Sequence, residues 1–282
     1  MKRILVPTDY SPLCANALDF AIDLALASGA EIHLVHFLNV PIEPATFSEL
    51  LREQNEVRTD FVSDLNLEDH QRQLKEMAGN SDSQVKIRTE IGGSGVVNGS
   101  KKYVSAHSID LIVLGADDVE EEKGEFPITV SQELTQFVEI PVISLTEPVD
   151  YADLARIVLG VDTLKHKNLD TLGQVIGSVL SGLEAEVHLI DVIRSGEVDP
   201  EELADRLTAL GKAAKLPDFD VQVLEHENDL EGLLLYADQL DAGLVAVVSD
   251  GRPNIFRFFK DSFATSVVKA TDLPVLVFNH KK

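Results

Sequence analysis

The sequence predicts an α/β protein of two tandem domains, each a doubly wound sheet of five parallel strands. Four segments recur in the same order in both halves of the chain: RILVPTD (3–9) as RIVLGVD (156–162), EIHLVHFLNV (31–40) as EVHLIDVIRS (186–195), DLIVLGADD (110–118) as GLVAVVSDG (243–251), and IPVISL (140–145) as LPVLVF (273–278). In each half, short apolar runs alternate with stretches of helical periodicity, which is typical of a parallel sheet covered by helices on both faces. A repeat of this length indicates a duplicated domain, not a solenoid of short units.

The two copies differ in length between their second and third strands. His33 and His188 are 155 positions apart, whereas Pro141 and Pro274 are 133 positions apart. The first copy therefore holds 22 more residues than the second, and we expect most of them in a helical insertion at about 41–80.

The first copy opens with strand, helix and strand. Ile4–Pro7 is a short apolar run of the buried-strand kind. Ala15–Leu26 has apolar residues at helical spacing, and Gly29 is expected to end that helix. Ile32–Leu38 is the second apolar strand, and Phe47–Met77 is long, charged and helical in pattern.

The rest of the first copy alternates in the same way. We expect strands and helices in turn at Val85–Ile91, Val96–Ala106, Leu111–Leu114, Val130–Phe137 and Val142–Leu145. The second copy repeats this order over Ile157–Phe278. The acidic, proline-containing stretch Glu147–Asp153 is the expected linker, so the predicted domains are residues 1–147 and 154–282.

The composition indicates which classes of binding partner are not expected. The chain has 24 Lys and Arg residues against 48 Asp and Glu residues, a formal net charge of −24. Such a surface repels phosphate backbones and anionic lipid, so neither nucleic acid nor a membrane is an expected partner. Cys14 is the only cysteine, which suits a reducing compartment, and the N-terminal segment leads straight into a strand without a signal-peptide pattern. The expected location is the cytoplasm.

The predicted topology also indicates where a ligand would bind. If the strand order is 3-2-1-4-5, the winding reverses between strands 1 and 4, and ligands of such sheets bind outside the carboxyl ends of the strands at that reversal. The loops of interest are those after strand 1, Thr8–Pro12 and Asp162–His166, and those that begin after strand 4 at Gly115 and Ser249.

These loops carry a resemblance to a known family. ILVPTDYSPLCANALDFAIDLA followed by AEIHLVHFLNV resembles the opening of universal stress proteins, and DLIVLGADD with EIPVISL resembles their closing half. IVLGVD and SDGRPNIFRFFKDSFATSVVKATDLPVLVF in the second copy resemble the same family again. The resemblance covers the chain except for about 41–80 and implies a tandem universal stress protein with an adenine-nucleotide alpha-hydrolase-like fold.

In this family, members that bind ATP carry a glycine motif after strand 4: Gly, two residues, Gly, nine residues, Gly, then Ser or Thr. Glycines let backbone N–H groups approach the phosphates, and a helix N-terminus and a hydroxyl complete the cradle. In the first copy Gly115 and Thr129 match, but Asp118 and Ile128 replace the other glycines. The connecting DDVEEEKGE is strongly acidic, so ATP is not expected there.

The second copy matches the motif differently. Gly251 and Ser262 match, whereas Val248 and Asp261 replace the other two glycines. The loop is basic, with Arg252, Arg257 and Lys260. If one half binds ATP or another adenine nucleotide, charge favours the second half. The alternative is a covering loop whose apolar side chains pack against the domain.

Both copies keep an aspartate after strand 1, where the family places an acidic residue facing the nucleotide. The alternative is that Asp9 caps the following helix or turn. The resemblance assigns a candidate, degenerate nucleotide-binding role to Thr8, Asp9, Val40, Gly115, Thr129, Asp162, Gly251, Arg252 and Ser262.

Other candidate sites do not combine into a reactive centre. His33 and His36 face opposite sides of a strand, so each strand histidine is expected to be packed or hydrogen-bonded. Cys14 is expected to fill apolar space. No catalytic triad, carboxylate pair or zinc spacing can be assembled, so neither catalytic nor metal-binding residues are expected.

Strand 5 of each copy suggests how the halves assemble. Val142–Leu145 and Val275–Phe278 are apolar strands expected at the sheet edge, where an exposed strand invites pairing. The family associates through this strand, so the resemblance implies that the two halves pair with each other as a pseudo-dimer. A homodimer of whole chains is left open.

Three functions fit these observations. The first is a non-enzymatic stress-response protein with degenerate nucleotide sites and no certain cofactor. The second is an ATP-binding switch or slow ATPase that uses mainly the second domain. The third is a sensor of another small ligand. An adenylyl- or electron-transfer enzyme is the least favoured, because fold analogy alone does not supply a catalytic constellation.

Overall fold

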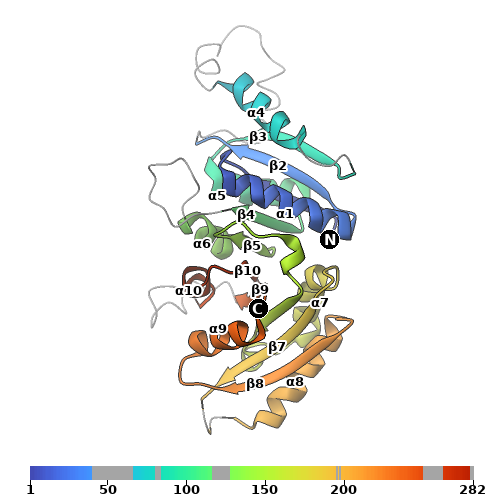
Figure 1. Ribbon diagram of the computed structural model, residues 1–282, viewed down its shortest axis with the longest axis vertical. Helices are drawn as coiled ribbons and strands as arrows, with labels where there is room; N and C mark the ends of the chain where they lie inside the picture. The colour runs from blue at the N-terminus through green and yellow to red at the C-terminus, as the bar shows by residue number, and fades with distance from the viewer. Residues whose placement is uncertain are drawn as a thin grey trace.

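Ten strands form one continuous sheet in the order β3-β2-β1-β4-β5-β10-β9-β6-β7-β8 (Figure 1). This computed structural model describes residues 1–39, 66–79, 84–115, 128–194, 196, 198–249 and 263–279. The strands are β1 (Arg3–Pro7), β2 (Glu31–Phe37), β3 (Ile87–Gly92), β4 (Leu111–Gly115), β5 (Val142–Leu145), β6 (Arg156–Gly160), β7 (Glu186–Ile193), β8 (Phe219–Glu225), β9 (Leu244–Ser249) and β10 (Val275–Asn279). The predicted order 3-2-1-4-5 is confirmed in the first half, and the second half has the same order, 8-7-6-9-10.

Helices cover both faces of the sheet (Figure 1). They are α1 (Pro12–Ser28), α4 (Leu67–Gly79), α5 (Gly95–His107), α6 (Ile128–Phe137), α7 (Leu169–Leu180), α8 (Pro200–Ala213), α9 (Asp229–Leu240) and α10 (Phe263–Ala270), with short 3₁₀ turns η2 (Tyr151–Asp153) and η3 (Thr163–Lys165). One apolar core lies under α1, α4, α7 and α8 and runs through both halves. The other face has two separate cores, one under α5 and α6 and one under α9 and α10.

The ends of α1 follow from local chemistry. The Ser11 side chain accepts a hydrogen bond from the Cys14 N–H at 3.2 Å, and Pro12 occupies the first turn, where its missing N–H costs nothing. Gly29 ends the helix in the left-handed conformation, and its N–H donates to the Ala25 carbonyl at 2.8 Å. The predicted end of this helix at Gly29 is therefore confirmed.

The two halves meet where β5 pairs with β10. Within each half neighbouring strands are parallel, but β10 runs antiparallel to β5, with Leu276 opposite Ile143. The side-chain amide of Asn279 also donates to the Ile140 carbonyl at 3.2 Å. Because the pairing is antiparallel, the strands of the two halves direct their carboxyl ends in opposite directions at this seam. The carboxyl ends of the strands therefore lie at a different edge of the sheet in each half.

The longer connection of the first half contains an ordinary crossover helix. Helix α4 lies between β2 and β3 in the chain, as α8 lies between β7 and β8. The predicted insertion at about 41–80 therefore includes this helix, which begins at Leu67. The rest of the predicted insertion, residues 41–65 and 80, lies outside the described part of the chain.

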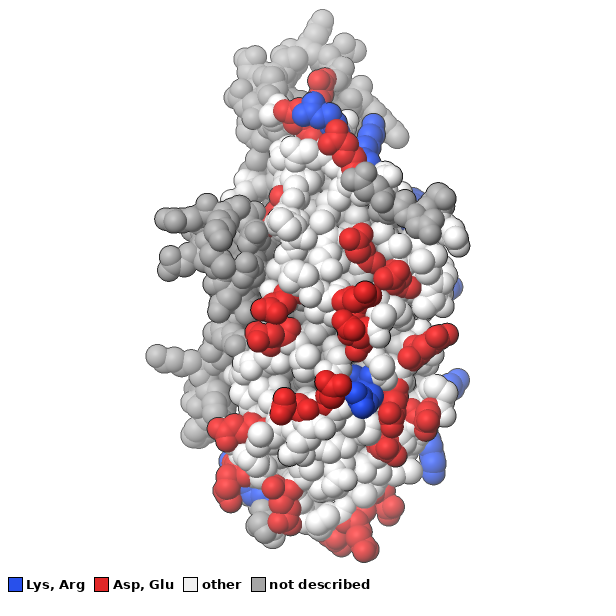
Figure 2. Space-filling model, in the orientation of Figure 1, with Lys and Arg blue, Asp and Glu red and all other residues white. Residues whose placement is uncertain are grey.

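The surface reflects the composition. Figure 2 shows acidic side chains spread over the visible face, with few basic side chains among them. Among the helices that the structure describes, none has the length and apolar character needed to cross a bilayer.

Candidate functional site

The loop after β1 is held by its own polar side chains. Thr8 is fully buried, and its hydroxyl accepts a hydrogen bond from the Tyr10 N–H at 2.9 Å. Asp9 Oδ1 accepts from the Ser11 N–H at 2.9 Å, so Asp9 closes the turn while Ser11 caps α1. The other carboxylate oxygen of Asp9 is buried and has no hydrogen-bond partner among the described residues. Of the two capping alternatives, Asp9 therefore caps the turn, whereas the helix is capped by Ser11.

Three aromatic rings stack beside this loop, at the carboxyl ends of β1 and β2. Tyr10 follows β1, His36 belongs to β2 and His70 to α4. The ring centroids of Tyr10 and His36 are 4.6 Å apart, and those of His36 and His70 are 4.5 Å apart. The Tyr10 hydroxyl lies 3.1 Å from His70 Nδ1, and His36 Nδ1 lies 2.7 Å from the Thr8 carbonyl. The stack therefore ties the loop to both neighbouring elements.

Burial keeps these rings uncharged at neutral pH. It lowers the pKa of His36 and of His70 below the usual imidazole value, and it raises the pKa of Tyr10 far above its ordinary range. Tyr10 also has a φ of 72°, in the left-handed region that is uncommon for residues other than glycine. A strained backbone of this kind persists only where its surroundings hold it, and here the stacked rings do so.

Gly115, the matching glycine of the first copy, lies at the end of β4 against the first turn of α1. A Cβ atom at this position would lie 2.5 Å from the Leu13 carbonyl oxygen. The Cys14 thiol donates to the Gly115 carbonyl at 3.7 Å. Cys14 is fully buried, and burial, aided by the nearby Asp9 charge, raises the pKa of its thiol to about 12. This close packing is a sufficient reason for a glycine at position 115, and the raised pKa disfavours the reactive thiolate form of Cys14.

The other candidate residues of the phosphate loops are not brought together by the described structure. Thr129 lies in the first turn of α6. Val40, Gly251, Arg252 and Ser262 lie outside the described residues.

The corresponding loop of the second half is closed in a different way. Asp162 accepts from the Lys165 N–H at 3.2 Å and forms an ion pair with the Lys165 ammonium at 2.6 Å. The N–H and hydroxyl of Thr163 both donate to Asp191 Oδ2, each at 3.0 Å. Arg206 on α8 donates to the Thr163 carbonyl at 2.6 Å. The polar groups at the end of β6 are thus bound by other groups of the same half.

The same pair of positions closes both loops. Tyr10 corresponds to Thr163 and His36 to Asp191 by the spacings of the repeat, and in each half these two residues contact one another. Sequence reasoning missed both pairs, along with His70. The repeat could have indicated these pairs, because in both halves the pair consists of the residue after the shared aspartate and a residue near the end of the second strand.

The buried carboxyl of Asp191 should make the free energy of unfolding depend on pH. Burial raises the pKa of this carboxyl from 3.8 to about 6, against the opposing hydrogen bonds from Thr163. The folded state therefore binds the proton more tightly than the unfolded state, so the contribution of Asp191 to the free energy of unfolding falls as pH rises from about 4 to about 6 and is constant above. Asp191→Asn should be more stable than wild type at pH 8 by up to roughly 3 kcal/mol, and close to it at pH 4.

Urea unfolding at both pH values measures this difference. Asp205→Asn, which removes an exposed carboxylate of α8, controls for the change in net charge. A difference between Asp191→Asn and wild type that is the same at pH 4 and pH 8 would contradict the linkage to Asp191.

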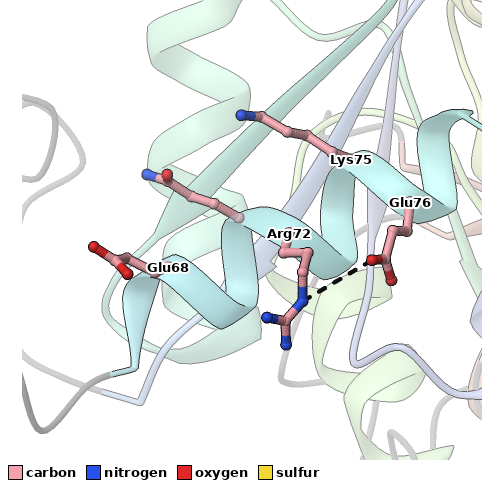
Figure 3. A pocket seen from close by; sticks show the side chains of 5 residues that line it. Glu68, Arg72, Lys75 and Glu76 are labelled. Carbon is pink, nitrogen blue, oxygen red and sulfur yellow. Dashed lines mark ion pairs between the residues drawn. The ribbon is translucent and has the colours of Figure 1, made fainter.

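A surface hollow of about 380 Å³ lies elsewhere, along the outer side of α4. It is lined by Glu68, Gln71, Arg72, Lys75 and Glu76. Figure 3 shows these side chains spread along the helix, with Arg72 directed toward Glu76 in an ion pair of 3.9 Å. None of the strand-end residues lines this hollow, and its lining consists of side chains of a single helix whose charged members are exposed.

Comparisons with known proteins agree with the topology. The model of the universal stress protein family matches residues 1–143. A universal stress protein from Archaeoglobus fulgidus DSM 4304 has a similar structure, with 17% identity, a TM-score of 0.65 and coverage of 99% of this chain and 97% of the other. The cytoplasmic domain of a prokaryotic cation chloride cotransporter is also similar, with 12% identity, a TM-score of 0.51 and coverage of 98% and 94%. No curated protein matches the chain. At such identities the structural likenesses show a shared fold, which different proteins use differently.

Proposed function

Because the chain belongs to the universal stress protein family, we propose that it is a non-enzymatic stress-response protein of the tandem type, whose nucleotide sites are degenerate. The proposal includes two domains, residues 1–147 and 154–282, that act as a pseudo-dimer in the cytoplasm. The single observation that carries it is the closure of both loops after the first strand by side chains of the chain itself.

The first half supports the proposal through its ring stack. A nucleotide base binds by stacking and by hydrogen bonds to free polar groups. Here Tyr10, His36 and His70 already stack on one another, and the Thr8 carbonyl already meets His36 Nδ1. A ligand at this place would have to displace packed rings. The acidic DDVEEEKGE segment adds charge repulsion against a triphosphate.

The second half supports it through hydrogen bonding. Asp191 and Arg206 use the polar groups of Thr163, and Lys165 neutralises Asp162. An acidic residue paired in this way is less available to a ligand.

The sequence of the second phosphate loop favours one alternative function. Arg252, Arg257 and Lys260 would attract phosphate, so an ATP-binding switch in this domain is the second candidate. Its site would include Asp162, Gly251, Arg252 and Ser262.

Isothermal titration with ATP and AMP tests the proposal. We expect no saturable heat for either nucleotide up to ~1 mM, because both loops after the first strand are closed. Mass analysis of natively purified protein should likewise find no bound nucleotide.

Stoichiometric, tight binding at both halves would overturn the proposal. Binding of one ATP that is lost in Ser262→Ala and Gly251→Val, but kept in Lys212→Ala, would replace it with the switch. Lys212 serves as the matched control because it is an exposed basic residue in the last turn of α8, at the opposite edge of the sheet.

A further inference from the structure

Each half of the protein contains a buried histidine that contacts a tyrosine and a glutamate at equivalent positions. His33 Nδ1 lies 2.9 Å from the Tyr103 hydroxyl, and His33 Nε2 lies 3.1 Å from Glu31. In the second half His188 Nδ1 lies 3.1 Å from the Tyr236 hydroxyl, and His188 Nε2 lies 3.3 Å from a Glu186 oxygen. The expectation of packed, hydrogen-bonded strand histidines is confirmed for both.

Basic side chains surround the glutamate of the first half. The ammonium of Lys86 lies 2.7 Å from Glu31, and the guanidinium groups of Arg3 and Arg88 lie 3.4 and 3.5 Å from it. Arg88 is placed there by strand register, because it pairs with His33 across β2 and β3. The negative charge of Glu31 is thus balanced within the protein.

Acidic side chains occupy the same places in the second half. The register of β7 and β8 pairs His188 with Asp220, so a carboxylate stands where Arg88 stands in the first half. Asp218 stands where Lys86 does, two residues earlier. No described lysine or arginine forms an ion pair with Glu186 or Asp220.

Arg156, the counterpart of Arg3, is paired with Glu186 in the register of β6 and β7, but its guanidinium forms an ion pair with Asp241 at 2.9 Å. The second half therefore lacks counterparts of Lys86 and Arg88, and its one neighbouring guanidinium among the described residues is paired with another carboxylate.

The histidine nitrogen that faces these carboxylates lies 3.3 Å from Glu186 but forms no hydrogen bond with it. The His188 side chain is only 7% exposed, and among the described residues its Nε2 atom is buried without a hydrogen bond. The equivalent nitrogen of His33 is bonded to Glu31. Ligand atoms of Glu186, His188 and Asp220 all lie within 4.8 Å of one another. A buried, unsatisfied imidazole nitrogen beside two carboxylates is the arrangement that a bound cation would complete.

We propose that Glu186, His188 and Asp220 bind one divalent transition-metal ion, Zn²⁺ or Mn²⁺, which takes the place of the basic side chains of the first half. An imidazole with two carboxylates suits these borderline cations. Two ligand atoms on a tetrahedral zinc are about 3.3 Å apart for bonds of about 2.0 Å, which is the separation of His188 Nε2 from Glu186. Tyr236 binds the other ring nitrogen and orients the imidazole, as second partners of metal-binding histidines do.

The ion would join two strands at the end of the sheet. Glu186 and His188 belong to β7, and Asp220 belongs to β8, the last strand of the ten. Water would complete the coordination, because Glu186 and Asp220 are exposed. Metal that binds only the folded chain stabilises it, so this site would secure an otherwise open edge.

Titration with Zn²⁺ and with Mn²⁺ in about 150 mM salt and excess Mg²⁺ tests the proposal, since these conditions suppress diffuse binding to an acidic surface. We expect one ion per chain and a Tm that rises by roughly 5 °C when the site is filled. Asp220→Arg, which recreates the arrangement of Arg88, and His188→Gln should each weaken binding by at least about tenfold and abolish the rise in Tm.

Glu202→Gln is the matched control, because it removes an exposed carboxylate of α8 and should leave binding unchanged. The exposed position of Asp220 means that Asp220→Arg should fold, which circular dichroism would verify. Equal affinity in wild type and Asp220→Arg, or no binding by wild type up to ~1 mM metal, would overturn the proposal.

Discussion

Replacing Gly115 with alanine is expected to lower the free energy of unfolding by about 3 kcal/mol. The added Cβ would lie 2.5 Å from the carbonyl oxygen and 2.7 Å from the carbonyl carbon of Leu13. Both are backbone atoms in the first turn of α1, so no rotamer change can relieve the overlap. The helix would have to move away from β4, on which it packs. Urea unfolding followed by circular dichroism measures the loss.

Gly79→Ala adds the same methyl group where no atom lies within 4 Å and is the matched control. It should leave stability unchanged or slightly raised, since alanine is the better helix former. If Gly115→Ala were as stable as Gly79→Ala, packing would not explain the glycine at position 115. Its match to the phosphate-loop glycine would then favour a role in ligand binding.

Replacing Ile143 with aspartate is expected to cost more than about 4 kcal/mol and to unfold the chain as a whole. Ile143 is fully buried on β5 and lies opposite Leu276 across the seam between the halves. An aspartate there would place an unpaired carboxylate in the core that runs under both α1 and α7. Because this core is continuous, wild type should unfold in a single transition, and the variant should lose structure in both halves together.

Ile143→Val separates charge from packing. It keeps the side chain apolar and should cost only about 1 kcal/mol. Equal urea midpoints for Ile143→Asp and Ile143→Val would show that a carboxylate at position 143 is not buried in the core. Two separate transitions in wild type would contradict a core shared by the halves.

Much of the fold could be predicted because it depends on local patterns. The apolar run at 142–145 matches β5 as observed, and the stop at Gly29 follows from its left-handed conformation. The long helical pattern over 47–77 was harder to interpret, because amphipathic periodicity does not reveal which part of a charged stretch packs on a sheet. Among the described residues, α4 begins only at Leu67.

The candidate site was predicted less well. The position after strand 1 drew attention to Asp9 and Asp162, whose role in ligand binding stays a prediction, but not to the side chains that close the two loops. His70 reaches Tyr10 from a helix 60 residues away in the chain. Arg206 reaches Thr163 from α8, 43 residues away. Neither contact can be recognised from a short-range sequence pattern, because each depends on how a crossover helix lies on the sheet.

The sequence by itself determined the duplicated α/β scaffold, the alternation of strands and helices, and the acidic character of the surface. These properties depend on periodicity and composition, which are local or summed over the chain. The tertiary structure decided which side chains meet. Strand register pairs His33 with Arg88 in one half and His188 with Asp220 in the other, and thereby gives two similar sequences opposite electrostatic surroundings. A shift of one residue in that register would turn either side chain to the other face of the sheet, so only the assembled sheet sets these neighbours.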